Sequence, residues 1–302
     1  IRKVASRVKQ ETDAGNQVAV VVSAMAGTTN QLVSWARDIG PMQDAREYDT
    51  IVASGEQVTV GLLAIALQNI GVDARSWLGW QIPVRTDEVH GAARIESIDT
   101  ELMRARLASG QVAVVAGFQG IAPDGRIATL GRGGSDTSAV ALAAALSADR
   151  CDIYTDVDGV YTTDPRIAPK ARKLDAISFE EMLEMASLGA KVLQTRSVAM
   201  AMRHNVKLQV RSSFSDAPGT LVVNEDAIVE QEKISGIAYS PDEAKVTIEG
   251  LPDEPGTAAA IFGELAANHI NVDMIVQSAT GEGQGADITF SMGRSDLARA
   301  ME

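Results

Sequence analysis

Apolar and polar residues alternate along most of the chain in segments that have either helical or strand-like spacing. Apolar positions in residues 1–8 recur at helical spacing, and the helix that they predict ends near Gly15. The unbroken apolar run 18–22 indicates a buried parallel strand, followed by a loop of small residues at 23–30. Further helices are expected at 30–39, 55–70 and 138–148, and a further buried strand at 112–116. This alternation predicts an α/β domain with a mostly parallel sheet between helix layers.

Two dipeptides and a change of composition add to this organisation. Asp124-Gly125 and Asp158-Gly159 favour tight hairpin turns, so antiparallel strands are expected to edge or extend the sheet. From about Pro218 a polar connector begins, and residues 244–249, 257–268, 272–278 and 287–292 then predict strand, helix, strand, strand. We therefore expect a first domain at 1–222 and a smaller α+β domain at 223–302, with 234–239 as a candidate additional strand.

Length and composition agree with two globular domains and exclude some functions. A chain of 302 residues exceeds the length at which a single core stops growing. The net charge of −13 disfavours nucleic-acid binding, and no apolar run is expected to reach the roughly 20 residues needed to span a membrane, so neither partner is expected. The single cysteine, Cys151, cannot form an internal disulfide, which favours the cytoplasm.

The strongest candidate for an anion site is the glycine-rich segment 130–138. It follows an expected strand and opens an alanine-rich helix, where free N–H groups and the helix dipole hold anions. Arg132 adds a planar fork suited to a carboxylate, while Ser135 and Asp136 could cap the helix or touch a ligand. A plain strand-to-helix connection is the alternative, and the combination of these three side chains favours the ligand site.

Four other segments carry candidate chemistry beside an ordinary structural interpretation. Residues 154–165 concentrate hydroxyls and carboxylates, which fits a nucleotide or magnesium-linked role or a simple hairpin; the acidic spacing does not fit an EF-hand. Residues 23–30 and the segment around Glu56 could bind a ligand or merely cap helices. The helix at 179–189 is mostly packing, but Lys191 beyond its end could reach a phosphate.

Taken together, these segments resemble the aspartate kinases, which have the amino-acid kinase fold, and the match runs over the whole chain. The residues that carry the resemblance are Gly-Arg-Gly-Gly-Ser-Asp at 131–136, Tyr-Thr-Asp-Val-Asp-Gly-Val-Tyr at 154–161 and Glu-Glu-Met-Leu-Glu-Met-Ala at 180–186. The resemblance implies ATP-dependent phosphorylation of the aspartate side-chain carboxylate to 4-phosphoaspartate, a first step towards lysine, threonine and methionine.

The resemblance also assigns roles to individual residues. Glu56 would bind the aspartate amino group, Arg132 its α-carboxylate, and Thr29 with Ser23 would face the reacting carboxylate. Asp136, Lys191 and Ser23 would be the catalytic residues. The substrate set would be Gly27, Thr28, Thr29, Asn30, Glu56, Arg132, Gly133, Gly134 and Ser135. The ATP set would be Ser23, Thr155, Asp156, Tyr161, Thr162, Thr163, Asp164, Pro165, Arg166 and Lys191.

The implied reaction depends on position and charge rather than on a general base. An aspartate side chain with a pKa of about 3.9 is already ionised at neutral pH. Phosphoryl transfer needs cations, and the family uses Mg²⁺, which we expect to be held through ATP and not by a protein cluster. The family's N-terminal strand, whose lysine meets the phosphates, is absent here, since Ile1 already lies in a helix. We therefore expect an upstream segment, and expect residues 1–302 alone to be inactive.

The C-terminal segment resembles an ACT domain, a ferredoxin-like module that senses amino acids at paired interfaces. Its loop Leu-Pro-Asp-Glu-Pro-Gly at 251–256 carries this resemblance. The implied site for lysine or threonine comprises Asp253, Glu254, Pro255, Gly256, Thr257, Ala258, Asn271, Val272, Asp273 and Gln277. A second ACT module is expected beyond this one, and a homo-oligomer or hetero-oligomer is expected to form through these modules.

Two alternatives to an aspartate kinase remain. One is another amino-acid kinase acting on glutamate, N-acetylglutamate or a carbamate; an N-acetylated substrate has no ammonium group for Glu56 to bind. The other is a regulatory chain that binds lysine or threonine without catalysis. The presence of Arg132, Asp136, Asp156 and Lys191 argues against a regulatory chain.

Overall fold

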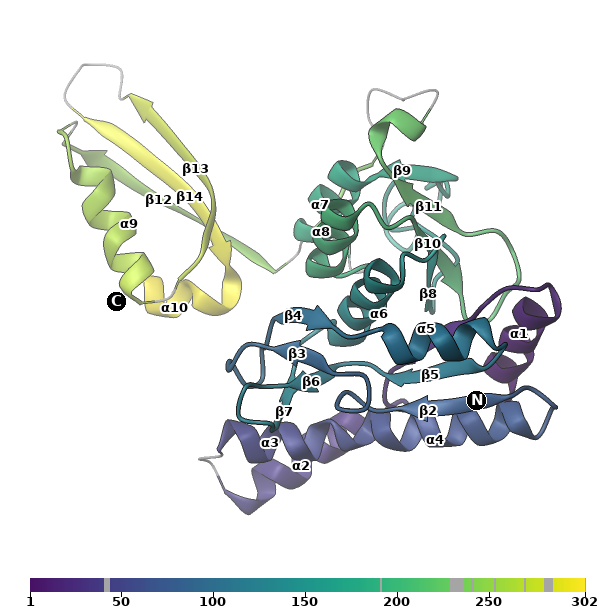
Figure 1. The fold of residues 1–302 in the computed structure, drawn as a ribbon. Helices are drawn as coiled ribbons and strands as arrows, with labels where there is room; N and C mark the ends of the chain where they lie inside the picture. Colours follow the sequence, from purple (N-terminus) through teal and green to yellow (C-terminus); the bar gives the residue numbers. More distant parts are fainter. Residues whose placement is uncertain are drawn as a thin grey trace. The chain divides into compact units, whose positions relative to one another are not determined.

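The computed structural model divides the chain into two compact units, Ile1–Ala238 and Tyr239–Glu302. Figure 1 shows the helices and strands of each unit. The structure describes residues 1–40, 44–190, 192–228, 236–239, 242–252, 254–268, 270–279 and 285–301. Lys191 and Asp253, both predicted site residues, lie outside the described residues, as do Ile234 and Ser235 of the candidate additional strand.

The first unit contains a long alternation of helices and strands. In chain order they are α1 Arg2–Asp13, β1 Ala19–Val22, α2 Thr28–Ile39, α3 Ala45–Val52, α4 Ser54–Gln68, β2 Ala74–Trp77, β3 Val84–Thr86, β4 Ile95–Ile98, α5 Glu101–Ala108, β5 Val112–Ala116, β6 Gln119–Ile121, β7 Ile127–Thr129, α6 Gly134–Leu146, β8 Cys151–Thr155, β9 Ala176–Ser178, α7 Phe179–Ser187, α8 Thr195–His204, β10 Leu208–Ser212 and β11 Thr220–Val223, with a 3₁₀ turn at Glu225–Ala227.

A three-stranded parallel sheet, in the order β1-β5-β2, forms the centre of this unit. Every residue of β5 is buried, and alternate residues pack on opposite faces. Val112 and Val114 contact the core beneath α1 and α4, whereas Ala113 and Val115 contact the core beneath α5. The predicted parallel sheet between helix layers is therefore confirmed, and α4 and α5 lie on its two sides in Figure 1.

A second sheet, in the order β4-β3-β6-β7, continues from the end of β5. Strands β6 and β7 form the antiparallel hairpin predicted at Asp124-Gly125. Gly125 has a φ of +82°, a conformation that glycine adopts without the strain of a Cβ atom. The end of β7 leads directly into the glycine-rich segment, so this hairpin sets the position of that segment.

The third sheet, in the order β8-β10-β11-β9, shows that one predicted hairpin is wrong. Strand β8 pairs in parallel with β10, and β9 pairs in parallel with β11, so no strand pair surrounds Asp158-Gly159. An isolated antiparallel bridge joins Tyr161 to Lys173 instead. The Val160 N–H donates to Thr220 Oγ1 at 2.8 Å, which shows that tertiary contacts with β11 determine the path of this segment.

The described part of the second unit is a three-stranded antiparallel sheet, in the order β12-β14-β13, with helices packed against it. Its elements are β12 Glu243–Leu251, α9 Thr257–Ala267, β13 Val272–Ala279, β14 Ala286–Gly293, a 3₁₀ turn at Arg294–Asp296 and α10 Leu297–Ala300. The predicted order of strand, helix, strand, strand is confirmed. Phe262 of α9 meets Phe290 of β14 edge to face, with ring centroids 5.6 Å apart. Residues 236–239, the described part of the candidate additional strand, contain no strand.

One helical stretch of the first unit is long and apolar enough to cross a membrane. It comprises α3 and α4 and spans 24 residues (Ala45–Gln68). No such stretch was expected from the sequence. Half of it is buried inside the protein, and Val60, Leu63 and Leu67 pack in the core beneath the central sheet. A helix in the core of a globular protein can be equally long and apolar. Packing against the core accounts for the apolar face of this stretch.

Asp49 of α3 is a buried centre of hydrogen bonds that joins the helix to the second sheet. Its side chain is fully buried and accepts from the Thr129 N–H at 2.9 Å, Thr129 Oγ1 at 2.6 Å and the Gly91 N–H at 3.0 Å. His90 Nδ1 lies at 3.0 Å from the same carboxylate. These bonds hold the turn at Gly91 against the end of β7, immediately before the glycine-rich segment.

We predict that Asp49→Asn lowers the free energy of unfolding by about 3 kcal/mol, because an amide replaces one acceptor oxygen with a donor that faces buried donors. Urea unfolding of the two proteins measures the difference. Asp38→Asn, at an exposed position on α2, is the control and should change the free energy by less than about 0.5 kcal/mol. Equal midpoints for Asp49→Asn and the wild type would contradict this role for Asp49.

Candidate active site

Three segments meet at the carboxyl ends of β1 and β5. A Cβ atom placed on Gly117, just after β5, would lie 3.0 Å from both Ser135 Cβ and Val21 Cγ1. A Cβ atom on Gly55, in the first turn of α4, would lie 2.7 Å from Ala24 Cβ. The loop after β1, the start of α4 and the start of α6 are therefore in close contact. Ligands of open α/β sheets bind at this edge.

Glu56 is the most distinctive group of this edge. It is 3% exposed, and its Oε1 accepts from the Ala24 N–H at 2.9 Å. The second carboxylate oxygen, Oε2, is buried and has no hydrogen-bond partner among the residues that the structure describes. Burial raises the pKa of Glu56, and the bond from Ala24 offsets part of that rise. An unpaired buried carboxylate oxygen is costly, and a cationic group would relieve that cost.

The glycine-rich turn adopts a conformation that requires its glycines. Gly131 and Gly133 have φ values of +75° and +70°, in the left-handed region. A Cβ atom on Gly133 would overlap the Gln194 side chain, and one on Gly134 would lie 2.7 Å from Phe118 Cδ2. Gly133 is also the N-cap of α6, with no side-chain cap. The first N–H groups of α6 thus start at this turn without a capping side chain, as in helix ends that bind anions.

The charged residues of this turn differ in their environment. Arg132 is exposed, whereas Asp136 lies in the first turn of α6, where burial raises the pKa of its carboxyl group. The α6 helix dipole favours a negative charge at this end. Ser135 faces Gly117, the residue that follows β5. The turn therefore presents an exposed cation beside a desolvated carboxyl group.

Helix α2, which follows the loop after β1, begins at an earlier residue than the sequence predicts. Helix α2 starts at Thr28, so Thr28, Thr29 and Asn30 form its first turn. Its N-cap is Gly27, with a φ of +81° and no side-chain cap. Ser23 follows directly after the end of β1. This places Ser23 and the first turn of α2 beside the N-terminus of α4, with Glu56.

The predicted ATP-binding residues follow β8, at the end of the third sheet. Thr155 ends β8, and its Oγ1 donates to Asp156 Oδ1 at 3.0 Å. The remaining residues, Tyr161, Thr162, Thr163, Asp164, Pro165 and Arg166, continue along the same segment. Arg166 pairs locally with Asp164 at 2.7 Å, and this pairing lowers the pKa of Asp164.

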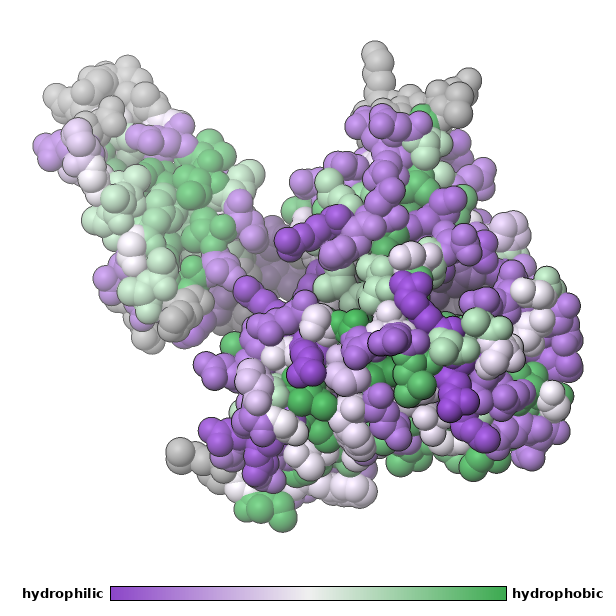
Figure 2. Space-filling model, viewed as in Figure 1, coloured by the Kyte–Doolittle hydropathy of each residue, from purple (hydrophilic) through white to green (hydrophobic). Residues whose placement is uncertain are grey.

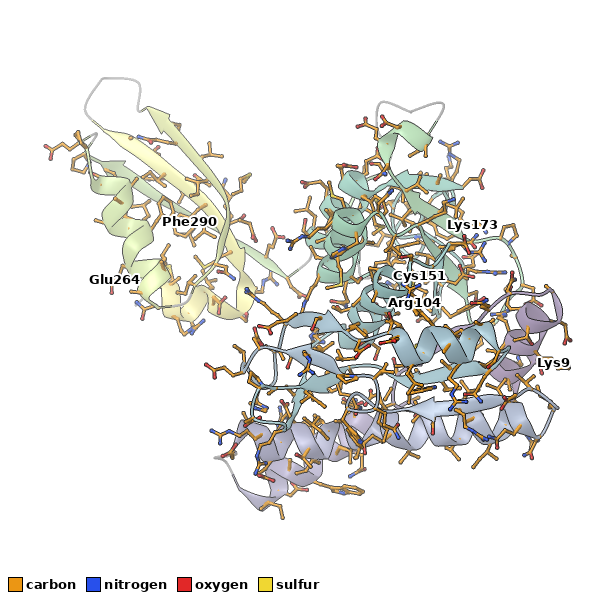
Figure 3. The ribbon with its side chains drawn as sticks, viewed as in Figure 1. Lys9, Arg104, Cys151, Lys173, Glu264 and Phe290 are labelled. Carbon is orange, nitrogen blue, oxygen red and sulfur yellow. The ribbon has the colours of Figure 1, made fainter. Side chains whose placement is uncertain are left out.

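Lys173 is a cation near this segment that the sequence did not single out (Figure 3). Its Nζ lies 3.4 Å from Asp158 Oδ2 and donates to the Pro218 carbonyl at 2.8 Å.

Cys151, at the start of β8, is buried. Its burial raises the pKa of its thiol to about 12, with smaller contributions from the charges of Asp152 and Asp136. The thiol therefore stays protonated at neutral pH and is not a nucleophile.

Helix α7 has well-formed ends that explain its position without any ligand. Ser178 and Glu181 form a capping box, and Met182 and Met185 pack in the core, as predicted. Gly189 has a φ of +113°, which fits the predicted glycine at the helix end. The acidic residues of this helix therefore belong to a packed and capped helix.

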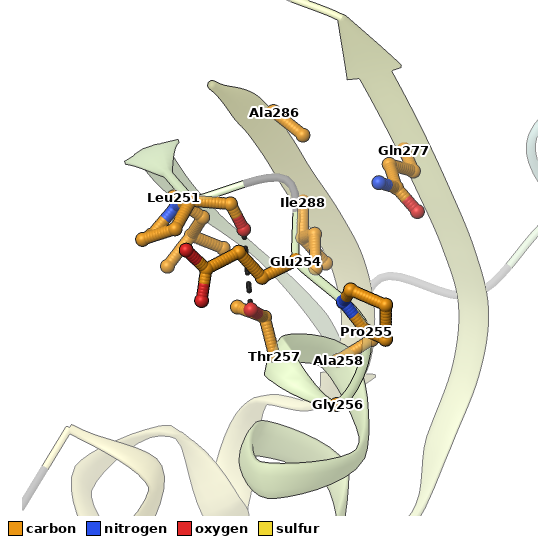
Figure 4. Close-up of a pocket in the computed structure, with 10 residues that line it drawn as sticks. Leu251, Glu254, Pro255, Gly256, Thr257, Ala258, Gln277, Ala286 and Ile288 are labelled. Atoms are coloured by element: carbon orange, nitrogen blue, oxygen red, sulfur yellow. Dashed lines mark hydrogen bonds between the residues drawn. The ribbon is translucent and has the colours of Figure 1, made fainter. Parts of the chain in front are cut away.

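The second unit contains a pocket of about 350 Å³ at the start of α9 (Figure 4). Its lining is Leu251, Pro252, Glu254, Pro255, Gly256, Thr257, Ala258, Gln277, Ala286 and Ile288. Thr257 Oγ1 donates to the Pro252 carbonyl at 3.1 Å, which fixes the loop against the helix. Asn271, Val272 and Asp273 lie at the opposite end of β13 from Gln277 and are not among these residues.

The family models define the class of protein to which these two units belong. Residues 1–212 match the amino acid kinase family, and residues 246–302 match the ACT domain. The chain thus combines a kinase fold with a small module of a second family. An aspartate kinase of Pseudomonas putida is 54% identical over 301 residues, which cover 99% of this chain and 73% of the relative. The chain belongs to the aspartate kinase family.

Solved structures agree with this assignment. The aspartate kinase from Synechocystis is 42% identical, with a TM-score of 0.67, and the match covers 99% of this chain and 51% of that one. Aspartokinase III of Escherichia coli in complex with aspartate and ADP is 30% identical, with a TM-score of 0.77, covering 96% and 74% of the two chains. The same enzyme in complex with lysine and aspartate is 29% identical, with a TM-score of 0.75 and coverages of 94% and 74%.

We predict that Glu56→Gln stabilises the ligand-free protein at pH 8. Because the pKa of Glu56 is raised in the folded state, folding disfavours the charged carboxylate. The wild-type protein therefore loses folding stability as the pH rises through the raised pKa, whereas the glutamine variant does not. At pH values below the ordinary glutamate pKa of about 4.3, both side chains are neutral and the difference should vanish.

Thermal melts at several pH values measure this difference, and we expect the melting temperature of Glu56→Gln to exceed that of the wild type by a few degrees at pH 8 only. Glu180→Gln, on the exposed side of α7, is the control. A Glu56→Gln protein that melts below the wild type at pH 8 would contradict a desolvation cost at Glu56.

Proposed function

We propose that this chain binds aspartate at the carboxyl ends of β1 and β5 and phosphorylates its side-chain carboxylate with ATP. The observation that carries the proposal is the buried Oε2 of Glu56, which has no hydrogen-bond partner among the described residues. The exposed Arg132 lies in the glycine-rich turn that opens α6. An α-amino acid carries an ammonium and a carboxylate, which are complementary to these two groups. The reacting carboxylate would then face Ser23 and Thr29 near the start of α2.

The same observation favours aspartate over N-acetylated substrates. An acetylated amine would leave Oε2 of Glu56 without a partner, and a buried polar group left unpaired gives strong discrimination. This argument does not distinguish aspartate from glutamate. The choice between them rests on the family, in which an Escherichia coli member has been solved with aspartate and ADP.

ATP would bind along the segment that follows β8. Thr155 and Asp156 lie at the carboxyl end of a parallel strand, where nucleotides bind in α/β folds. The exposed Arg166 would exchange its local partner, Asp164, for a phosphate. Lys191 and Asp136 remain the proposed catalytic residues, with Lys191 as a cation for the phosphates and Asp136 as the group that orients the reactants.

Mg²⁺ would be held mainly by the phosphates of ATP. In the part of the chain that the structure describes, no group of three His, Cys, Asp or Glu side chains could hold a metal. Magnesium usually keeps only one or two protein carboxylates beside substrate phosphates, so this donor set is compatible with it. Asp136 lies in the first turn of α6, at the helix end where phosphates would lie, and the ion would neutralise charge on the transferred group.

Regulation would take place in the second unit. The pocket lined by Glu254, Thr257 and Gln277 offers a carboxylate, a hydroxyl and an amide, which suit the ammonium and carboxylate groups of lysine or threonine. Asp253, Asn271, Val272 and Asp273 stay proposals for the same effector.

Exposed Met274, Ile275 and Val276 follow one another on β13, where Figure 2 shows hydrophobic residues gathered, and this favours assembly through the ACT unit. We also propose a cytoplasmic location.

We predict that Arg132→Lys raises the KM for aspartate at least tenfold, because an ammonium cannot form the bidentate pair that a guanidinium forms with a carboxylate. Coupled assays of the full-length protein with ATP and Mg²⁺ measure turnover with aspartate, glutamate and N-acetylaspartate. Arg75→Lys, at an exposed position on β2, is the control and should leave the kinetics unchanged. Turnover with N-acetylaspartate equal to that with aspartate would contradict the proposed site.

We predict that Gln277→Leu weakens inhibition by lysine or threonine about tenfold, because the loss of one hydrogen bond to a charged ligand is worth that much. Turnover without effector should stay unchanged, since Gln277 belongs to the second unit. The control is Ser278→Ala, because the adjacent position on β13 faces the other side of the sheet. Unchanged inhibition in Gln277→Leu would place the effector outside this pocket.

A further inference from the structure

Arg196 donates hydrogen bonds to two backbone carbonyls from distant parts of the chain. Its Nη1 donates to the Leu130 carbonyl at 2.8 Å, and its Nη2 donates to the Ala93 carbonyl at 2.7 Å. Leu130 and Ala93 are 1% and 0% exposed, so these carbonyls belong to buried residues. One planar guanidinium therefore holds two backbone segments side by side, which an ammonium group could not do with the same geometry.

The arginine and its two carbonyl partners belong to different parts of the first unit. Helix α8 packs through Val198 and Ala201 in the core beneath β8 and β10, on the side of the proposed ATP segment. Leu130 follows β7 of the second sheet and directly precedes the glycine-rich turn. Arg196 is thus a hydrogen-bonded connection between the part of the first unit that carries the ATP segment and the part that carries the aspartate site.

The start of α8 makes a second contact with the same turn. Gln194, the N-cap of α8, lies so close to Gly133 that no Cβ atom would fit there. The Ala93 N–H donates to the Thr129 carbonyl at 2.9 Å, and Asp49 of α3 accepts from the Thr129 N–H. The stretch from Thr129 to Gly133 is therefore held by α3 on one side and by α8 on the other.

We propose that Arg196 is a positioning residue for aspartate binding, which acts by holding Leu130 and thereby the Arg132 turn in the geometry that receives the substrate carboxylate. This inference rests on the proposed function of the turn. Arg196 does not touch the substrate itself. Its loss would leave the turn free to move by fractions of an ångström, and misplacement of that order weakens binding strongly.

The test compares Arg196→Lys with the wild type in the full-length protein, using ATP, Mg²⁺ and aspartate. We expect the KM for aspartate to rise about tenfold, with kcat and the KM for ATP changed by less than about threefold, because one of the two carbonyls loses its donor. Arg203→Lys, at an exposed position later on α8, is the matched control and should behave as the wild type.

Chemical rescue provides a readout that a purely structural role would not move. In Arg196→Ala, low millimolar guanidinium chloride should restore the KM for aspartate, whereas sodium chloride at the same ionic strength should not. An unchanged KM for aspartate in Arg196→Lys, or an equal rise in both KM values, would overturn the positioning role. Wild-type protein without aspartate-dependent turnover would overturn the proposed function, and with it this inference.

Discussion

The close approach of backbone segments around Gly117, Gly133 and Gly134 is the constraint on which the rest of the site depends. Cβ atoms at these positions would meet Ser135, Gln194 and Phe118, so the end of β5, the start of α6 and the start of α8 can meet only as glycine backbone. This packing brings the first turn of α6 to the carboxyl edge of the central sheet. Without it, the start of α6 would not lie against the ends of β1 and β5.

The site also keeps charge out of solvent at a cost to stability. Burial raises the pKa values of Glu56 and Asp136, which means that both carboxylates are less stable here than in water. Such groups persist where they prepare a site for a charged ligand, because the ligand then supplies the missing partner. For phosphoryl transfer to a carboxylate that is already ionised, this prepared geometry is the main contribution that the protein can make.

The sequence predicts those features that depend on local pattern. Apolar runs located β1 and β5, the glycine-rich segment was placed correctly before α6, and the order of elements in the second unit was confirmed. The hairpin at Asp158-Gly159 was wrong because Thr220, far along the chain, binds the Val160 N–H. Asp49 and Arg196 were missed for the same reason, since their partners are backbone groups distant in sequence that no motif or spacing reveals.

The hydrogen bonds of the backbone also show where the proposed ATP segment is restrained. The Thr162 N–H donates to the Arg172 carbonyl at 2.9 Å, and the Thr162 carbonyl accepts from the Ile237 N–H at 2.7 Å. Ile237 lies near the end of the first unit, just before the chain enters the second. Effector binding can change activity only if it shifts a balance between two states of the protein. A state in which the Ile237 bond is broken would free one side of the proposed ATP segment.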